Sequence, residues 1–497
     1  MRNTIFAMLA AIGLAANAQT WEKVGSLQVT DTAGLTAAVA KLGDITGNAM
    51  IGAMFAAKMA TLPGNDFFGP MRQGGSIYVP VYVDCDKLAQ TEDVDDLDDT
   101  LEWAVVYPIA VPKDEFVKMH DGAFETNGMV VVKGLPFESR EDWDEGDVTF
   151  VAFSGDGKWA AASDKPEQVA LATADFAAAA ETMNEDLVRV SILPKGMKIV
   201  REAMAKAAKC REPEDKKIGR AVLDVLDGVD VFSGAVRVCD AGIDMRCSLK
   251  TVEGSAMSRI GDVSVTGDPF AFDGGDGVMA VMNALRDTES IRKELSACLD
   301  AFKTNGIDLA QFTASTTSEG TSRIVFDVGS ALKHFSNPSN KVDDACFENI
   351  CKDLDSLDNS DEGFVPAKRP EFVSVAIKGF RPAYSASSRF AAILPEAAGK
   401  PLVYAATYSL AAIVKAVAAA ALETCDDKTR AEVAPFMSFL PKECVGGVAG
   451  AYWREDGELK FMSRISADEL KGIVSSASSM VMFAMMRANS IDECDED

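Results

Sequence analysis

The chain has 497 residues, and its 76 acidic against 49 basic side chains give it a formal net charge of −27 at pH 7. Hydrophobic residues make up 48% of the chain, which is enough to bury a sizeable core and excludes wholesale disorder. Nucleic acids and anionic membranes require a basic patch on their partner, and no basic cluster offsets the acidity here. We therefore expect no nucleic-acid partner, and the length predicts two to four domains.

The first 18 residues are typical of a cleavable signal peptide. Arg2 provides a positive start, residues 5–14 are apolar, and Ala16 and Ala18 form a small-x-small cleavage site before Gln19. The apolar run is too short to span a membrane. We predict cleavage after Ala18, a periplasmic or extracellular protein, and no membrane span in the mature chain.

The N-terminal third alternates strand and helix signals. A strand pattern at residues 24–30 leads into Asp31, a natural helix cap, and a helix is expected through Leu42. Residues 77–83 form a strand pattern that contains Pro80. Because proline donates no backbone hydrogen bond, this strand is expected to lie at a sheet edge or to carry a bulge.

Four later segments have the pattern of a β-hairpin, with apolar residues alternating on either side of a turn that contains glycine. These segments are residues 148–163, 233–249, 312–328 and 448–465. Each has a helix signal before or after it. The recurrence predicts a duplicated strand-helix-hairpin plan.

The last hairpin leads into a helix. Ser466 and Glu469 have the spacing of a capping box, in which the two residues satisfy free N–H groups at a helix start. Residues 402–422 are apolar enough to be considered as a membrane span, but Lys415 interrupts them. We expect this segment to be buried in the protein instead.

Three stretches carry a resemblance to a known kind of protein. They are the signal peptide, the GDGKW turn at residues 155–159 with its SDKPE helix start, and the SRISADEL junction at residues 463–470. In these features the chain resembles exported bacterial proteins of unknown function with duplicated strand-helix-hairpin units. The resemblance implies no catalytic residues.

The fold class that these patterns predict is α+β. Antiparallel β-hairpins should form one or two curved sheets with helices packed on one face, and the plan should be internally duplicated. The expected division is a first lobe at 19–185, a second lobe at 186–336, an acidic linker or insertion at 337–369, a C-terminal lobe at 370–490 and an acidic tail at 491–497.

The residues for familiar chemistry are scarce. With only His120 and His334, a HExxH metal pair is impossible and a Ser-His-Asp triad would need one of these two. Ser330 and Lys333 match the SxxK pattern of a lysine-activated serine, but its partner motifs do not follow. The acidic loop at 358–369 has a partial EF-hand pattern that ends in arginine where glutamate is required.

The ten cysteines are irregularly spaced and include no CxxC motif, so buried thiols with one or two disulfides are expected. We predict no catalytic, cofactor-binding or metal-binding residues. The favoured function is an exported non-catalytic envelope protein that binds an unknown protein or small-molecule partner. The alternatives are an exported hydrolase of unrecognised type, either carboxylate-based or using Ser330 and Lys333, and a calcium-dependent interaction module.

Overall fold

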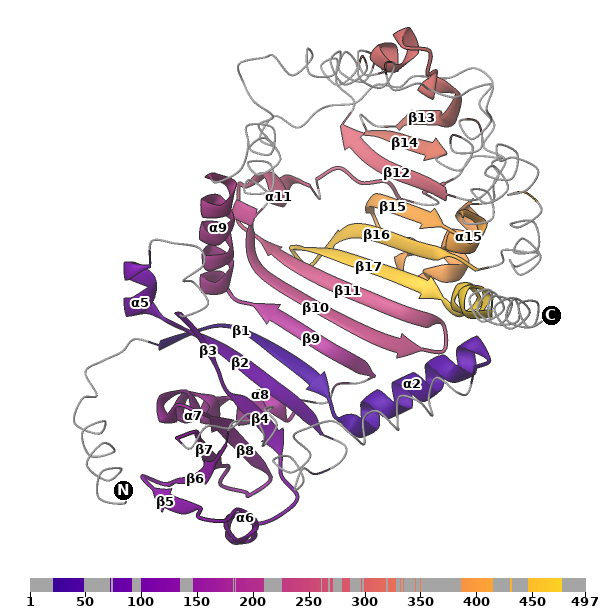
Figure 1. Cartoon of the computed structure of the whole chain (residues 1–497). Coiled ribbons are helices and arrows are strands. Elements are labelled where there is room, and N and C mark those ends of the chain that lie inside the picture. The colour runs from indigo at the N-terminus through magenta and orange to yellow at the C-terminus, as the bar shows by residue number, and fades with distance from the viewer. Residues whose placement is uncertain are drawn as a thin grey trace, which may run out of the picture. The chain divides into compact units, whose positions relative to one another are not determined.

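A computed structural model of the chain describes residues 21–48, 75–91, 100–134, 146–209, 226–266, 279–286, 299–327, 386–413 and 446–475, apart from a few positions within these ranges, and some isolated residues elsewhere. The chain divides into two compact units (Figure 1). Unit 1 comprises residues 1–35, 57–226 and 230–233, and unit 2 comprises residues 36–56, 227–229 and 234–497.

Unit 1 is built on antiparallel strands that pair in the order β9-β1-β2-β4-β8-β7-β6-β5, with β3 also alongside β2. The strands are β1 (Trp21–Thr30), β2 (Ser76–Asp84), β3 (Leu101–Trp103), β4 (Val105–Pro108), β5 (Phe124–Thr126), β6 (Met129–Lys133), β7 (Val148–Phe153), β8 (Trp159–Ser163) and β9 (Asp186–Ile192). Strands β4 and β8 are buried along their whole length.

Both faces of the β4-β8-β7-β6 region are covered. On one face, Val106 and Ala161 belong to an apolar cluster with α7 (Pro166–Ala172) and α8 (Phe176–Ala179). On the other face, Val105 and Ala160 pack with the buried Phe116 of α6 (Lys113–Met119). The sequence predicts helices on one face of the sheet. In this region α6 packs on the second face as well.

Unit 1 also contains α5 (Cys85–Gln90), the 3-10 turn η2 (Thr173–Asp175) and α9 (Pro194–Lys209). Helix α9 begins at Pro194, and proline suits the first turn of a helix. It lies so close to β1 that a Cβ atom on Gly196 would come 2.2 Å from the carbonyl oxygen of Val24. Glycine is therefore required at this contact.

The strands of unit 2 pair antiparallel in the order β11-β17-β16-β15-β12-β14-β13. They are β11 (Gly242–Thr251), β12 (Met279–Arg286), β13 (Thr313–Ser318), β14 (Thr321–Asp327), β15 (Leu402–Tyr408), β16 (Val448–Glu455) and β17 (Glu458–Ser466). Strand β10 (Val229–Cys239) precedes β11 across a short turn and lies beside it (Figure 1). The described residues also include helices α2 (Thr32–Thr46) and α11 (Ala256–Arg259).

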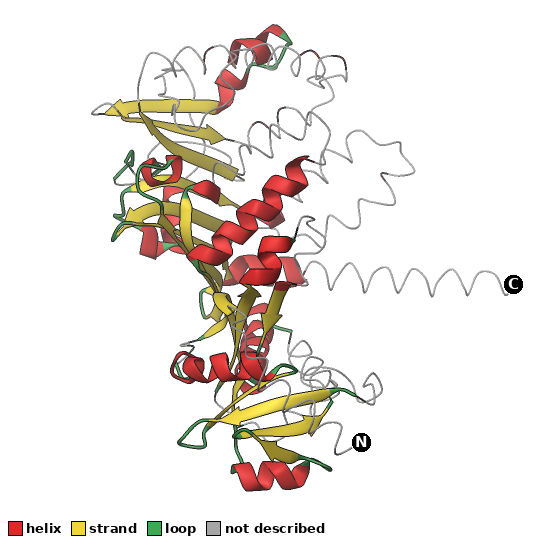
Figure 2. Cartoon of the chain, turned by 90° about the vertical axis from the view of Figure 1, so that its left-hand side faces the viewer, coloured by secondary structure: helices red, strands yellow, loops and turns green. Residues whose placement is uncertain are grey.

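The core of unit 2 lies between one face of this sheet and α15 (Ala386–Ile393) with the 3-10 turn η5 (Pro395–Ala397). Phe390 and Leu394 pack on Met282, Ala405 and Met462 from three different strands. The aromatic rings of Phe390 and Phe270 meet edge to face, 5.6 Å apart. Figure 2 distinguishes the strands from the helices that pack on them.

The α+β class with antiparallel hairpins is confirmed, and all four hairpins form where the sequence predicts them. The predicted division into lobes stays a prediction. In the structure β9 pairs with β1 and β11 pairs with β17, far along the chain. Internal duplication stays a hypothesis. The signal peptide and the linker at 337–369 lie outside the described ranges.

Strand β2 is not an edge strand, since it pairs with β1 on one side and with β3 and β4 on the other. Pro80 is tolerated because the ladder is irregular beside it. Strands β3 and β4 break at Ala104, whose N–H donates to the Pro80 carbonyl at 3.3 Å, and β1 shifts register between Lys23 and Gly25.

The segment considered as a membrane span begins as strand β15 and enters a helix at Leu410. Among the helices that the structure describes, none has the length and apolar content needed to cross a membrane.

Candidate functional site

The two faces of the β11-β17-β16-β15 region of unit 2 differ in chemistry. Because side chains alternate along a strand, Met462 and Arg464 of β17 point toward the core, whereas Phe461 points to the opposite face. The core face carries a buried ionic network. The opposite face carries a row of partly exposed aromatic rings.

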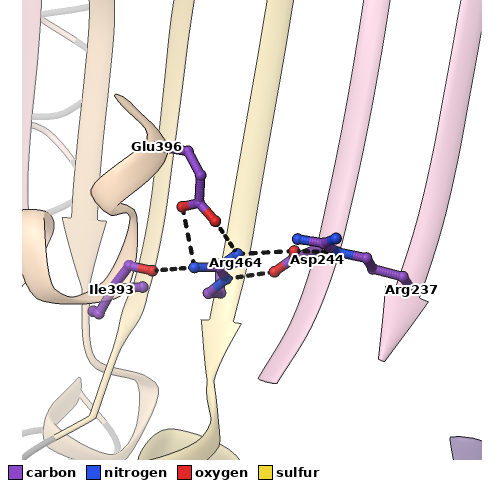
Figure 3. A network of polar contacts seen from close by, with 5 residues as sticks. All are labelled: Arg237, Asp244, Ile393, Glu396 and Arg464. Atoms are coloured by element: carbon purple, nitrogen blue, oxygen red, sulfur yellow. Dashed lines mark hydrogen bonds and ion pairs between the residues drawn. The ribbon is translucent and has the colours of Figure 1, made fainter. Parts of the chain in front are cut away.

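The ionic network is centred on Arg464 (Figure 3). Its guanidinium binds Asp244 of β11 through Nε and through Nη2, the latter at 2.9 Å. It also binds Glu396 of η5 through Nη1 at 3.1 Å and Nη2 at 2.7 Å. The Ile393 carbonyl accepts a further bond from Nη1 at 3.0 Å, and Arg237 of β10 donates to Asp244 at 2.7 Å.

This network uses every donor that the guanidinium possesses. Arginine has five N–H groups, and the five bonds of Arg464 account for all of them. Its side chain is 4% exposed, and that of Asp244 is fully buried. A saturated, buried guanidinium has no donor left for a ligand. The network is therefore a structural clamp that fastens α15 and η5 to the sheet.

The electrostatics agree with a fixed ion pair. Burial opposes ionisation of Asp244, but hydrogen bonds from Arg464 and Arg237 outweigh it and hold the pKa of Asp244 below its usual range. Hydrogen bonds to Asp244 raise the pKa of Arg464. Both groups stay charged across the neutral range, so neither can exchange a proton in an acid–base step there.

A second buried carboxylate, Glu469, caps a helix. It accepts hydrogen bonds from the Ala411 backbone N–H at 2.8 Å and from the Ser409 hydroxyl at 3.1 Å. Both donors lie at the start of the helix that follows β15, where the first N–H groups lack partners within the helix. Glu469 thus stabilises a helix start about 60 residues earlier in the chain.

The opposite face of the sheet carries three aromatic rings in register. Tyr404, Tyr452 and Phe461 lie on adjacent strands and are paired directly across β15, β16 and β17. The two tyrosine rings are 5.6 Å apart, and the rings of Tyr452 and Phe461 are 4.6 Å apart. Cys247 of β11 pairs with Phe461 and extends the row, and Met245, 44% exposed, lies on the same face. We call these five residues the aromatic face.

The ionisable groups of the aromatic face are not poised for proton transfer at neutral pH. Burial raises the pKa of Tyr404 and of Tyr452, and burial also raises the pKa of the Cys247 thiol. At neutral pH the two hydroxyls stay protonated, and the thiol is not activated as a nucleophile. The face therefore presents apolar ring surface with a few neutral polar tips.

Sequence reasoning identified the alternation in this hairpin but not which of its faces is covered by helices. Both faces carry large apolar residues, so the pattern alone could not separate them. The inward face contains Arg464, whose charge suggests an outward position, and the outward face contains Phe461. The sequence signal for the outward face was one aromatic residue in each of three strands, Tyr404, Tyr452 and Phe461.

Of the residues considered for catalysis, the structure describes His120 and His334. Ser330 and Lys333 lie outside the described residues. The His120 ring contacts the Phe116 carbonyl at 2.9 Å beside the end of α6, and His334 packs on Phe312 at 5.4 Å. In the described part of the chain, no three His, Cys, Asp or Glu side chains gather as a metal site.

The acidic loop at 358–369 also lies outside the described residues. Three cysteines are described, Cys85, Cys239 and Cys247, and all three are free thiols.

No family model matches the chain, and no curated protein matches it. Among solved structures, the chain is similar to one described as crystal form I of TP0453, at 8% sequence identity and a TM-score of 0.23. The match covers 62% of this chain and 88% of the other. A likeness of this size carries no argument about fold or function.

Proposed function

We propose that the chain is an exported, non-catalytic envelope protein that binds a protein partner through the aromatic face of unit 2. The observation that supports this proposal is the in-register row of Tyr404, Tyr452 and Phe461 on the sheet face opposite the core. The signal-peptide pattern of residues 1–18 is the support for export.

The composition of the face suits a protein partner. Tyrosine, phenylalanine and methionine are enriched at the centres of protein interfaces, and charged residues are depleted there. The row of Cys247, Phe461, Tyr452 and Tyr404 contains no charge, and neither does the adjacent row that starts at Met245 and continues through Ser463, Gly450 and Ala406. Rigid rings also lose little conformational entropy on binding.

Charge narrows the class of partner. The chain carries a formal net charge of −27, so a second acidic copy would be repelled and a basic protein would be attracted over a long range. We therefore propose a basic partner with an apolar contact surface. Its association rate should fall as salt screens the attraction, whereas its dissociation rate should depend on the rings.

Site-specific photo-crosslinking can locate the partner. A p-benzoylphenylalanine at position 245 places the crosslinker on the aromatic face, and the same residue at position 119 of α6 provides a matched control, because Met119 is also exposed, at 52%. The proposal expects one protein to crosslink from position 245 and not from position 119. Equal crosslinking from both positions would contradict it.

The identified partner is then purified and its dissociation constant measured. Removing a central interface ring typically costs about 2 kcal/mol or more, which corresponds to roughly a 30-fold weaker complex. We expect Tyr452→Ala to weaken binding by this amount, and Trp103→Ala, at an exposed ring of unit 1, to leave it unchanged. A dissociation constant within twofold of wild type for Tyr452→Ala would refute the proposed surface.

A further inference from the structure

A buried glutamine in unit 1 lacks the partners that its side chain requires. Gln168 of α7 has no exposed surface, and neither its Oε1 nor its Nε2 atom has a hydrogen-bond partner. Unpaired buried amides are rare in folded proteins, because the group gives up its bonds to water and gains nothing in return.

Gln168 lies on the side of α7 that packs on the sheet. Residues four apart share a side of a helix, so Gln168 points the same way as Ala172, which belongs to the apolar cluster between α7 and the sheet. That cluster also includes Ala152 of β7 and Ala161 of β8. Ala152 and Ala161 end at Cβ, and the larger side chains of Phe150 and Trp159 belong to the same cluster.

A second polar group without a partner borders the same cluster. Trp21 of β1 packs against it, and its buried indole N–H has no acceptor. Other polar groups at this face are paired: Lys23 binds Tyr78 at 2.8 Å, and Tyr82 donates to Asp175 at 3.2 Å. The Gln168 amide and the Trp21 indole N–H are therefore unpaired beside polar groups that are paired.

We infer that Gln168 is a binding site, inside unit 1, for a small uncharged ligand that both donates and accepts hydrogen bonds. The amide oxygen calls for a donor and the amide nitrogen for an acceptor. A charged ligand would need a counter-charge, and the cluster around α7 is apolar. Water is the smallest ligand with this chemistry, and a small neutral amide or polyol is the other source.

The first test needs no variant. A high-resolution crystal structure of the full chain should show density within about 3.2 Å of Oε1 or Nε2 of Gln168. Ordered density at this position supports the site. An apolar environment without density there overturns the inference, whatever the variants do.

The second test separates the two ligand sources and uses a matched pair of glutamines. Magnetic relaxation dispersion of water oxygen counts long-lived internal water, and mass spectrometry after denaturation detects a released small molecule. Gln168→Leu should lower the count of long-lived internal waters if water is the ligand, or abolish the small-molecule signal if a released molecule is. Gln28→Leu should keep the wild-type signal, because the buried amide of Gln28 already donates to Ser76 at 2.8 Å and to the Glu181 carbonyl at 3.3 Å.

If Gln168→Leu does not fold, Gln168→Met keeps the side-chain length and removes the same polar atoms. A bound ligand predicts that this variant has a lower melting temperature than wild type. A higher melting temperature would show that the amide was unpaired and would refute the site.

Discussion

The clamp formed by Arg464 leads to a quantitative prediction. Arg464→Met removes the guanidinium and leaves Asp244 fully buried with Arg237 as its remaining cation. Breaking a buried ion pair by removing one partner costs about 3–5 kcal/mol, because the other charge stays desolvated. Glu396 loses its partner too, but its side chain is 43% exposed and can be solvated.

Hydrogen exchange followed by mass spectrometry suits this test, because it reports each unit separately and does not require a two-state transition. Peptides from α15, β11 and β17 should exchange faster by roughly a hundredfold to a few thousandfold, taking 1.4 kcal/mol as a factor of ten. Peptides from β8 of unit 1 should be unchanged and provide the internal reference.

Lys460→Met is the matched control, since it removes a cation from the same strand. Lys460 binds Glu455 at 3.0 Å, but both side chains are about a third exposed, so solvent screens the pair and little protection should be lost. An unchanged exchange rate in Arg464→Met, or an equal loss in Lys460→Met, would refute the clamp. The double variant Arg464→Met with Asp244→Leu should recover much of the protection, because the fully buried carboxylate is removed and Arg237, whose side chain is 22% exposed, can reach solvent.

Three further predictions concern single residues. Gly446→Ala should destabilise unit 2 by about 3 kcal/mol in chemical denaturation, because a Cβ atom at this position would lie 2.1 Å from the Glu469 backbone nitrogen. Gly155→Ala is the control and should not change stability, because a Cβ atom there would have no neighbour within 4 Å. The free energy of unfolding of wild type should exceed that of Asp244→Asn by a constant amount from pH 6 to 8. This difference should shrink below about pH 4, because the pKa of Asp244 is lower in the folded state than in the unfolded state. A difference that stays constant down to pH 2 would contradict this prediction. An NMR titration should give Glu455 a pKa of about 2, since two lysines and an indole donate to it, and a normal value would show that these contacts do not persist in solution.

Local turn chemistry made much of the fold predictable. The turn between β16 and β17 is Asp456-Gly457, and both residues have positive φ, at 54° and 82°. An Asp-Gly pair suits the two-residue hairpin turns that match strand twist, and it lies between two alternating segments. The hairpin could therefore be placed from some twenty residues alone.

The capping box shows where local reasoning ends. The Ser466 hydroxyl accepts the Glu469 N–H at 3.3 Å, as the spacing predicts. The Glu469 carboxylate, however, binds Ser409 and Ala411 instead of returning to Ser466. That choice depends on which helix start lies nearby in space, and the spacing of residues within one segment carries no such information.

The clamp was not predictable for the same reason. Arg464 and Asp244 are 220 residues apart, and each looks like an ordinary solvated charge within its own strand. Only the pairing of β11 with β17 brings them together. The aromatic face likewise requires the order of β15, β16 and β17, which no single hairpin specifies.

The pairing of β11 with β17, which is far away in the sequence, has a consequence for biogenesis. Strand β11 has its full partner only after β17 has been made, about 220 residues later. At translation rates of about 5–20 residues per second, this delay lasts roughly 10–40 s. During this time the edge of β11, with Met245 beside it, has no β17 to pair with and is open to other strands. Nascent chains that end before residue 458 should therefore engage holding chaperones, and chains that extend past residue 466 should release them.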